Sequence, residues 1–369
     1  MRKYRLGEIC DVVSGGTPSR ATAEFWDGGT IPWIKIGNIQ RKYVDEADEY
    51  ITQAGLEGSS AKMLSAGTIL FTIFATLGEV GILTIEACTN QAIAGITIKN
   101  QSDILTDYLY YFLKSQKSCI AALGRGVAQN NINLSILRNF EVPIPDLPMQ
   151  KQIVAILDKT AKVVEVRQQQ LQQLDELVKA RFVELFGDGN HPHIALIDLI
   201  IEGAGLSYGI VQPGDDGTGD MGVLRPVDMV DGKISTASIK YIDRSIGDGF
   251  KKTELYGDEL LITVRGTTGI TALTDIRFNG MNVTRGIAVV RYDRNKINPV
   301  YLNAYLNTDE SQRYIQEHTR GATLQQINLS DLRVQQIMVP PLALQEQMAA
   351  FIEQTDKSKV VVQDEVNGL

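Results

Sequence analysis

The residues of this chain whose types could do chemistry are basic and amide side chains in polar loops. Arginine and lysine contact phosphate or guanine, and asparagine and glutamine pair bidentately with adenine. Such side chains recur at equivalent places in two blocks of the sequence, which makes them candidates for contact with nucleic acid. In the first block the candidates are Ser19, Arg20, Lys35, Asn38, Asn90, Gln91, Arg125, Gln129 and Asn130. In the second block they are Tyr208, Gln212, Arg225, Arg265, Thr267, Arg285, Arg320, Gln325 and Gln326.

Taken singly, each of these residues has a plainer explanation. Most exposed arginine and glutamine side chains simply face water, and Asn133 and Asn328 are suited to cap a helical turn. The segment 265–296 is locally basic, with six basic residues against Asp275 and Asp293. The matched placement in both blocks, rather than any one residue, favours contact with nucleic acid.

Motifs for catalysis are missing from the sequence. It has no phosphate-binding Gly-x-x-x-x-Gly-Lys-Ser/Thr loop. It also lacks the Asn-Pro-Pro-Tyr or Asp-Pro-Pro-Tyr tetrapeptide with which amino-methyltransferases hold the target amine. His191 and His193 could hold a metal ion, but no third ligand stands at a suitable spacing, and a linker fits better. We therefore expect a protein that is not an enzyme and uses no cofactor or metal, and a stand-alone methyltransferase is disfavoured.

The composition is that of an ordinary globular protein with an acidic balance. The 369 residues carry a net charge of −8, and neither block is basic: residues 1–145 hold 13 basic and 14 acidic side chains, and residues 187–340 hold 15 and 19. Any nucleic-acid surface must therefore be a local patch. No apolar run is long enough to cross a membrane, and the first residues lack a signal peptide's apolar segment. Cys10, Cys88 and Cys119 are unclustered and odd in number, which predicts a cytoplasmic protein without disulfides.

Two heptad repeats predict long helices that position these loops. Between Pro148 and Phe186 apolar or central residues recur at alternating spacings of four and three, as in helices that pair. These positions are Ile153, Leu157, Thr160, Val164, Arg167, Leu171, Leu174, Val178, Arg181 and Leu185. A second repeat after Pro341 continues through Leu344, Met348, Ile352, Thr355, Lys359, Val362 and Val366. We expect the two helices to pair with each other.

The two blocks form an internal duplication. Residues 222–229 repeat the pattern of residues 32–39 at a shift of 190, and residues 321–333 repeat residues 126–138 at a shift of 195. A slow drift of this kind indicates small loop insertions within one topology. We predict a mixed α+β fold, in which two duplicated α/β domains are separated by two long helices. The expected boundaries are 1–145 for the first domain, 146–186 for the central helix, 187–340 for the second domain and 341–369 for the C-terminal helix.

Both blocks end in the same series of motifs, namely Asn-Leu-Ser-x-Leu, a strand, Pro and Leu-x-x-Gln, before a heptad helix. Together with residues 32–38, 208–212 and 222–228, this order resembles the specificity subunits of type I restriction-modification systems over essentially the whole chain. The resemblance implies two target-recognition domains, each reading one half of a split double-stranded DNA sequence. It also implies docking of two modification subunits, which carry S-adenosylmethionine chemistry, and a motor-nuclease restriction subunit in the full complex.

The connection between the blocks predicts how the helices run. The link at 187–192 spans only about 20 Å when extended, and domain termini usually lie close together. The second helix should therefore begin near the end of the first and run back antiparallel to it. Their overlap of about 36 Å matches one turn of B-DNA, so we expect half-sites centred about one turn apart. The alternative is a non-catalytic coiled-coil scaffold whose duplicated domains bind protein or glycan, which the acidic balance favours.

Overall fold

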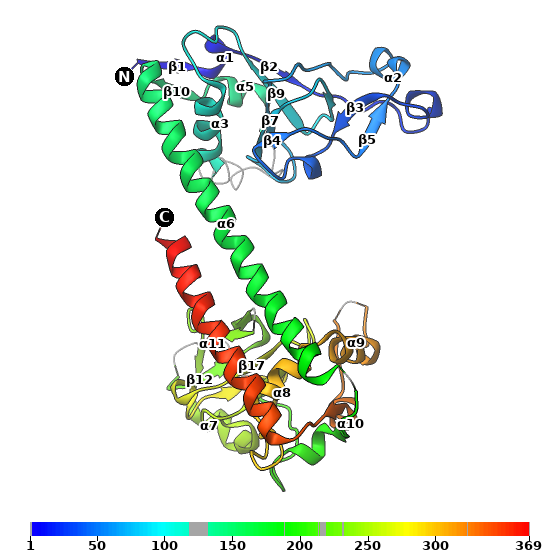
Figure 1. Ribbon diagram of the computed structural model, residues 1–369, viewed down its shortest axis with the longest axis vertical. Helices are drawn as coiled ribbons and strands as arrows, with labels where there is room; N and C mark the ends of the chain where they lie inside the picture. The colour runs from blue at the N-terminus through cyan, green and yellow to red at the C-terminus, as the bar shows by residue number, and fades with distance from the viewer. Residues whose placement is uncertain are drawn as a thin grey trace. The chain divides into compact units, whose positions relative to one another are not determined.

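The computed structural model describes residues 2–117, 132–187, 189–212, 214, 219–230, 232–322 and 324–368. The chain divides into two compact units, Met1–Glu165 and Val166–Leu369 (Figure 1). Each unit combines strands and helices around its own hydrophobic core. The mixed fold with two duplicated domains and two long helices is thus confirmed.

The first unit is built on a five-stranded sheet in the order β2-β9-β6-β7-β4. Every residue of β6 and β7 is buried, as expected for apolar strands that are covered on both faces. A smaller sheet has the order β5-β3-β8, and β1 pairs with β10. The elements are β1 (Arg2–Arg5), α1 (Leu6–Ile9), β2 (Cys10–Ser14), β3 (Ile31–Ile34), β4 (Tyr43–Val44), β5 (Glu49–Ile51), α2 (Gln53–Glu57), β6 (Ile69–Thr72), β7 (Val80–Leu83), β8 (Cys88–Thr89), β9 (Ile93–Ile98), α3 (Thr106–Ser115), α5 (Leu134–Arg138) and β10 (Glu141–Ile144).

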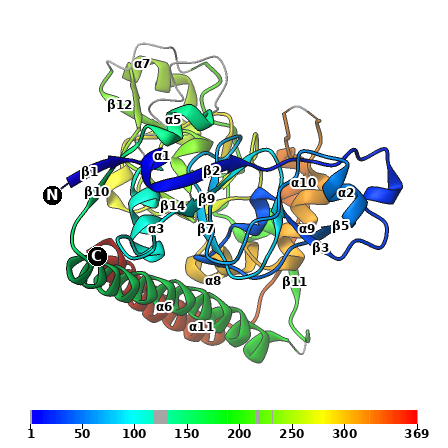
Figure 2. The same cartoon turned by 90° about the horizontal axis from the view of Figure 1, so that it is seen from above.

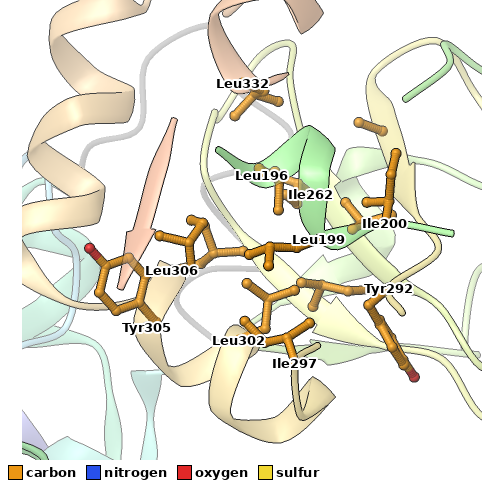
Figure 3. Close-up of a cluster of buried hydrophobic side chains, with 14 of the residues drawn as sticks. Leu196, Leu199, Ile200, Ile262, Tyr292, Ile297, Leu302, Tyr305, Leu306 and Leu332 are labelled. Atoms are coloured by element: carbon orange, nitrogen blue, oxygen red, sulfur yellow. The ribbon is translucent and has the colours of Figure 1, made fainter. Parts of the chain in front are cut away.

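The second unit repeats this arrangement with sheets ordered β17-β16-β19 and β15-β12-β18 and with the pairs β11-β20 and β13-β14. Figure 3 shows Ile262 of β16, Leu302 of α8 and Leu332 of α10 in its buried cluster. The elements are β11 (His193–Ala195), β12 (Met221–Leu224), β13 (Met229–Val230), β14 (Lys233–Ile234), β15 (Lys240–Ile242), α7 (Arg244–Gly247), β16 (Leu260–Thr263), β17 (Thr271–Leu273), β18 (Asn282–Val283), β19 (Ile287–Val290), α8 (Pro299–Leu306), α9 (Asp309–His318), α10 (Leu329–Val334) and β20 (Gln336–Met338).

The duplication extends to single hydrogen bonds. In both units the central strand, β6 or β16, ends at a threonine whose hydroxyl accepts a hydrogen bond from the backbone across a turn. Thr72 accepts from the N–H of Glu79 and Thr263 accepts from that of Ile270, each at 2.9 Å. The same turn therefore follows both strands, at a shift of 191 residues.

The two long helices are α6 (Leu147–Phe186) and α11 (Leu342–Asn367). Within the second unit they run antiparallel and lie side by side (Figures 1 and 2). Arg167 pairs with Glu365 at 2.8 Å and Asp175 pairs with Lys359 at 2.7 Å. The residue numbers rise along α6 while those of the partners fall along α11, as in an antiparallel pair. Every expected seam position of α11, from Leu344 through Met348 and Thr355 to Val366, is buried or half-buried. The antiparallel pairing is therefore confirmed.

Two elements differ from what their sequence patterns suggest. The alternation of residues 32–39 is typical of a strand, but β3 ends at Ile34, because the side-chain oxygen of Asn38 accepts from the N–H of Lys35 at 2.9 Å and closes a turn. The amphipathic pattern of residues 107–122 is typical of a helix; α3 ends at Ser115, and residues 118–131 lie outside the described part of the chain. His193, expected in a linker, begins β11 and pairs with Met338.

Candidate nucleic-acid interface

The second unit gathers its candidate residues at one edge of its sheets. Arg225 follows β12, Arg265 follows β16, and Arg285 precedes β19, which is antiparallel to β16. Backbone hydrogen bonds tie these places together: the N–H of Thr284 donates to Leu224 at 2.9 Å and that of Val264 donates to Gly286 at 2.8 Å. Residues 20 to 60 positions apart in sequence therefore share one surface.

Two further loops join this edge through backbone contacts. The N–H of Arg285 donates to the carbonyl of Ile210 at 2.9 Å, which brings in residues 208–212. The N–H of Gly266 donates to Gln325 at 2.9 Å, and Arg320 and Gln326 exchange two hydrogen bonds of 2.8 Å. We call the resulting surface the second rim, comprising Tyr208, Gln212, Arg225, Arg265, Thr267, Arg285, Arg320, Gln325 and Gln326.

The arginines of the second rim are not equally available to a ligand. Arg225 donates two hydrogen bonds to the fully buried carboxylate of Asp228, from Nε at 3.0 Å and from Nη2 at 2.9 Å. These hydrogen bonds raise the pKa of the Arg225 guanidinium. Arg320 is exposed and lies 3.9 Å from Asp331. Arg265 is half-buried and Arg285 is exposed, and neither makes an ion pair with any described residue. These two are the cations that the fold leaves free for an anionic partner.

The locally basic segment 265–296 is therefore not one basic surface. Arg277 pairs with Asp275 at 2.6 Å and Arg294 pairs with Asp258 at 2.5 Å. Asp258 precedes β16, so this pair lies at the other end of that strand from Arg265. Charge counting along the sequence could not separate the paired cations from the free ones.

The first unit brings its candidates together by the same construction. Lys35 follows β3, and Asn90 and Gln91 precede β9. The N–H of Asn90 donates to Ile34 at 3.1 Å, and Thr17 donates a hydrogen bond to the side chain of Gln91. We call this surface the first rim, comprising Ser19, Arg20, Lys35, Asn38, Asn90 and Gln91; Arg125, Gln129 and Asn130 lie outside the described residues.

Carboxylates neutralise the described cations of the first rim. Glu49 accepts from Lys35 at 2.6 Å and pairs with Arg20 at 2.5 Å. The hydrogen bond from Lys35, followed by that from Arg20, lowers the pKa of Glu49, so the carboxylate stays charged. The guanidinium of Arg20 also stacks over Trp26, 3.7 Å from the ring centroid, and Trp26 donates to the carbonyl of Ser19 at 3.0 Å. The charged groups of Arg20 and Lys35 are thus already engaged by contacts within the unit.

Tight glycines hold the loops of both rims against the strands. A Cβ atom on Gly15 would collide with the carbonyl oxygen of Thr89, and one on Gly209 would collide with that of Val283. The two glycines occupy equivalent places, 194 residues apart. Only glycine permits this close approach of two backbones.

Sequence reasoning missed two structural arginines and one exposed aromatic residue. Arg138 and Arg333 end the Asn-Leu-Ser-x-Leu-Arg motif, and each donates to the carbonyl of a distant residue, Val12 at 2.7 Å and Leu206 at 2.9 Å. Phe74, which is 42% exposed, stands in the first unit where Arg265 stands in the second. The shift of 191 residues would have revealed the pairing of Phe74 with Arg265.

The described residues contain no group of His, Cys, Asp and Glu that could hold a metal ion. Cys10 and Cys88 are buried, and burial raises their pKa values to about 12 and about 11, so both thiols are protonated at neutral pH and poor nucleophiles. In the same part of the chain no helix is long and apolar enough to span a membrane.

Comparison with known proteins agrees with this geometry. The specificity subunit of the type I enzyme EcoR124I/EcoR124II of Escherichia coli is 33% identical over 160 residues, which cover 42% of this chain and 39% of that relative. The MjaIX specificity subunit of Methanocaldococcus jannaschii is 22% identical, and the match covers 95% of this chain and 85% of the relative. The crystal structure of the type I S subunit from M. genitalium shares the fold, with a TM-score of 0.54, 15% identity, and 100% and 92% of the two chains covered. The family model of the type I restriction modification DNA specificity domain matches residues 1–176 and 220–365, so this chain belongs to that family and carries two copies of its domain.

Proposed function

We propose that this chain is the DNA-recognition subunit of a type I restriction-modification complex and that each unit reads one half of a split target. The observation that carries the proposal is the repetition of one rim, built at the same strand ends, in both units. Two copies of a reading surface in one polypeptide can read two short sequences with unread base pairs between them. Family membership favours DNA over the protein or glycan ligands of a scaffold.

We propose further that methyl transfer is supplied by two modification subunits and cleavage by a motor-nuclease subunit. This chain belongs to a family of recognition subunits and is not an enzyme. The starts of α6 and α11 are equivalent, since buried Gln150 and Gln345 hold them in the same way. A surface that occurs twice in one chain can bind two copies of the same partner. In this proposal the complex acts on chromosomal DNA and therefore works in the cytoplasm. The buried free thiols of Cys10 and Cys88 suit that reducing compartment.

An exchange of domains tests the proposal. The full chain is produced with a modification subunit, and methylated sites are mapped across a host genome. Replacement of residues 1–145 by the equivalent block of a relative should change one half of the methylated sequence and leave the other half intact. The matched variant, with residues 187–340 exchanged, should change only the other half.

Two outcomes would contradict the proposal. A single contiguous target, or a change of both halves after one exchange, would show that the units do not read separately. Methyl transfer by this chain without partner subunits would show that it carries its own catalytic site.

A further inference from the structure

The turn after β6 and the turn after β16 are the same structural position in the two units. The N–H groups of Ile73 and Val264 donate at 2.8 Å to the residues just before the antiparallel partner strands, β9 and β19, and their carbonyls each accept a hydrogen bond of 3.0 Å. The next residue in each unit is therefore equivalent: Phe74 in the first and Arg265 in the second. An exposed aromatic ring stands where the second rim has a free cation.

The backbone presents Phe74 on a fixed turn. Ala75 has a φ of 59°, and it is the described non-glycine residue with a positive φ. Its equivalent, Gly266, has a φ of 85°. Non-glycine residues adopt this conformation at an energetic cost and tend to do so at functional sites. The turn thus keeps its geometry in the first unit although alanine replaces glycine there. It holds Phe74 beside the first rim.

The chemistry of the first rim is apolar and amide, whereas the second rim is cationic. Phe74 lies beside Asn90 and Gln91 of the first rim, whose side-chain oxygens accept from the N–H of Ala92 at 3.0 Å and from the hydroxyl of Thr17. The described cations Arg20 and Lys35 are neutralised by Glu49 together with Asp48. The NH2 groups of Asn90 and Gln91 can donate to base acceptors such as adenine N7 or thymine O4, and an apolar side chain suits the C5 methyl group of thymine, the apolar feature of the major groove. The apolar ring therefore points to an A·T base pair, and the amide donors are compatible with one.

We propose that Phe74 is a specificity-determining residue, which contacts the C5 methyl group of a thymine in the half-site read by the first unit. The inference rests on the proposed function and deepens it. It predicts that this half-site contains at least one A·T pair whose methyl group is read. At the equivalent position the second unit uses Arg265, whose partner is guanine or phosphate, so the two half-sites are recognised by different chemistry.

A methyl-deletion experiment tests the contact. The full chain is assembled with its modification subunit, and the target is first mapped by methylation. Binding is then measured on duplexes in which each thymine of the first half-site is replaced, one at a time, by deoxyuridine, which lacks only the methyl group. At one position the wild-type complex should lose about fivefold in affinity, the order expected for burial of one methyl group. Phe74→Ala should lose a similar factor on the thymine duplex and nothing more on the deoxyuridine duplex, because the two changes remove the same contact.

Controls separate this contact from other effects. Phe74→Leu, which keeps an apolar side chain, should retain part of the methyl preference. Tyr50→Ala removes another exposed aromatic side chain of the same unit, on strand β5, and should leave the response to deoxyuridine unchanged. Arg265→Ala should weaken binding but leave the response to deoxyuridine in the first half-site unchanged.

The outcomes distinguish the inference from the proposed function. A first half-site without any A·T pair, or a Phe74→Ala complex that still prefers thymine, would overturn the role of Phe74 while bipartite recognition stood. A Phe74→Ala loss that persists on every deoxyuridine duplex would indicate a ring inserted between bases and would equally overturn methyl reading. A complex that binds no bipartite target at all would overturn the proposed function itself.

Discussion

Arg265 and Arg285 differ from the other cations near them because no described carboxylate neutralises either side chain. We expect Arg265→Ala and Arg285→Ala each to weaken binding of the half-site that the second unit reads. A contact to a base edge should cost about 1–3 kcal/mol and relax the sequence preference at one position, whereas a phosphate contact should lower the salt slope by about one. Binding measured at several salt concentrations on matched and mismatched duplexes distinguishes the two.

Arg277→Ala is the matched control for these variants. Arg277 is also exposed, but it pairs with Asp275 at the opposite end of the sheet. It should leave both affinity and salt slope unchanged. If Arg277→Ala weakened binding as much as Arg285→Ala, net charge rather than the second rim would govern binding to DNA.

The paired positions Ala75 and Gly266 allow a test of backbone strain. A Cβ atom added to Gly266 would meet nothing within 4 Å, so Gly266→Ala isolates the cost of the left-handed conformation. We expect this variant to lower the free energy of unfolding of the second unit by about 1–2 kcal/mol. Ala75→Gly should raise that of the first unit by about 0.5–1 kcal/mol, because glycine relieves the strain but loses more entropy on folding.

Chemical denaturation of the full chain, followed by probes in each unit, measures both changes. Opposite signs for the two substitutions are the expected result. Destabilisation by Ala75→Gly would mean that the Ala75 methyl group makes a stabilising contact that outweighs the strain.

At the residue scale the sequence predicted candidate side chains in equivalent loops of the two units. It predicted neither that these loops meet at one edge nor which of their cations are free. Arg225 and Arg285 stand in two different loops, each with a counterpart in the first block. The structure brings these two loops to one edge of the second unit. The availability of each charge depends on carboxylates that local sequence cannot assign. Glu49 reaches Arg20 from 29 positions away, and Arg294 is paired by Asp258.

At the scale of elements, the long helices were the most predictable part of the fold. Heptads repeated over α6 and α11 leave no competing period, and the two antiparallel ion pairs lie where the repeat predicts. The strands that pair over long distances were less accessible. The pairing of β1 with β10 joins residues more than 130 positions apart, and alternation within four residues gives no information about a partner.

Two buried glutamines anchor the starts of the long helices. The side-chain oxygen of Gln150 accepts from the N–H of Leu105 at 2.9 Å, and that of Gln345 accepts from Asn298 at 2.8 Å. Their amide nitrogens donate to backbone carbonyls, among them that of Pro145 at 2.9 Å for Gln150. Both side chains are fully buried, so every lost bond leaves a polar group without water.

We therefore expect Gln150→Leu to destabilise the first unit and Gln345→Leu to destabilise the second, by about 2–4 kcal/mol each. Leucine matches the size of glutamine but pairs with none of the backbone groups left behind. The exposed neighbours Gln152 and Gln347 provide controls, and their replacement by leucine should change stability by less than about 0.5 kcal/mol. Denaturant unfolding of the four variants gives the comparison, and equal losses at buried and exposed positions would contradict the anchoring role.

At the scale of the whole molecule, α6 is one uninterrupted helix whose two ends belong to different cores. Ile153 and Val154 pack against the core of the first unit, while Phe182 and Leu185 pack against that of the second. A continuous helix transmits any change of length or rotation from one end to the other. We propose that the length of α6 sets the number of unread base pairs between the two half-sites.

Insertion of four helix-forming residues after Lys162 tests whether α6 acts as this ruler. The site lies between Asp158, which pairs with Lys42 at 2.6 Å, and Arg167, which pairs with Glu365, so both sets of contacts can persist. The insertion adds about 6 Å and turns one end by about 40° relative to the other. One base pair of B-DNA advances about 3.4 Å and turns about 35°. The added length thus corresponds to about two base pairs and the added rotation to about one.

We expect the unread gap to widen by one or two base pairs while both half-site sequences stay the same. Methylation mapping of the original and lengthened chains, each with the same modification subunit, measures the gap directly. Replacing the exposed Gln168, Gln169 and Gln173 by alanine changes the surface of α6 but not its length, and should leave the gap unaltered. A gap that ignores the insertion would show that the spacing is set elsewhere than in α6, and a changed half-site would show that α6 also shapes the reading surface.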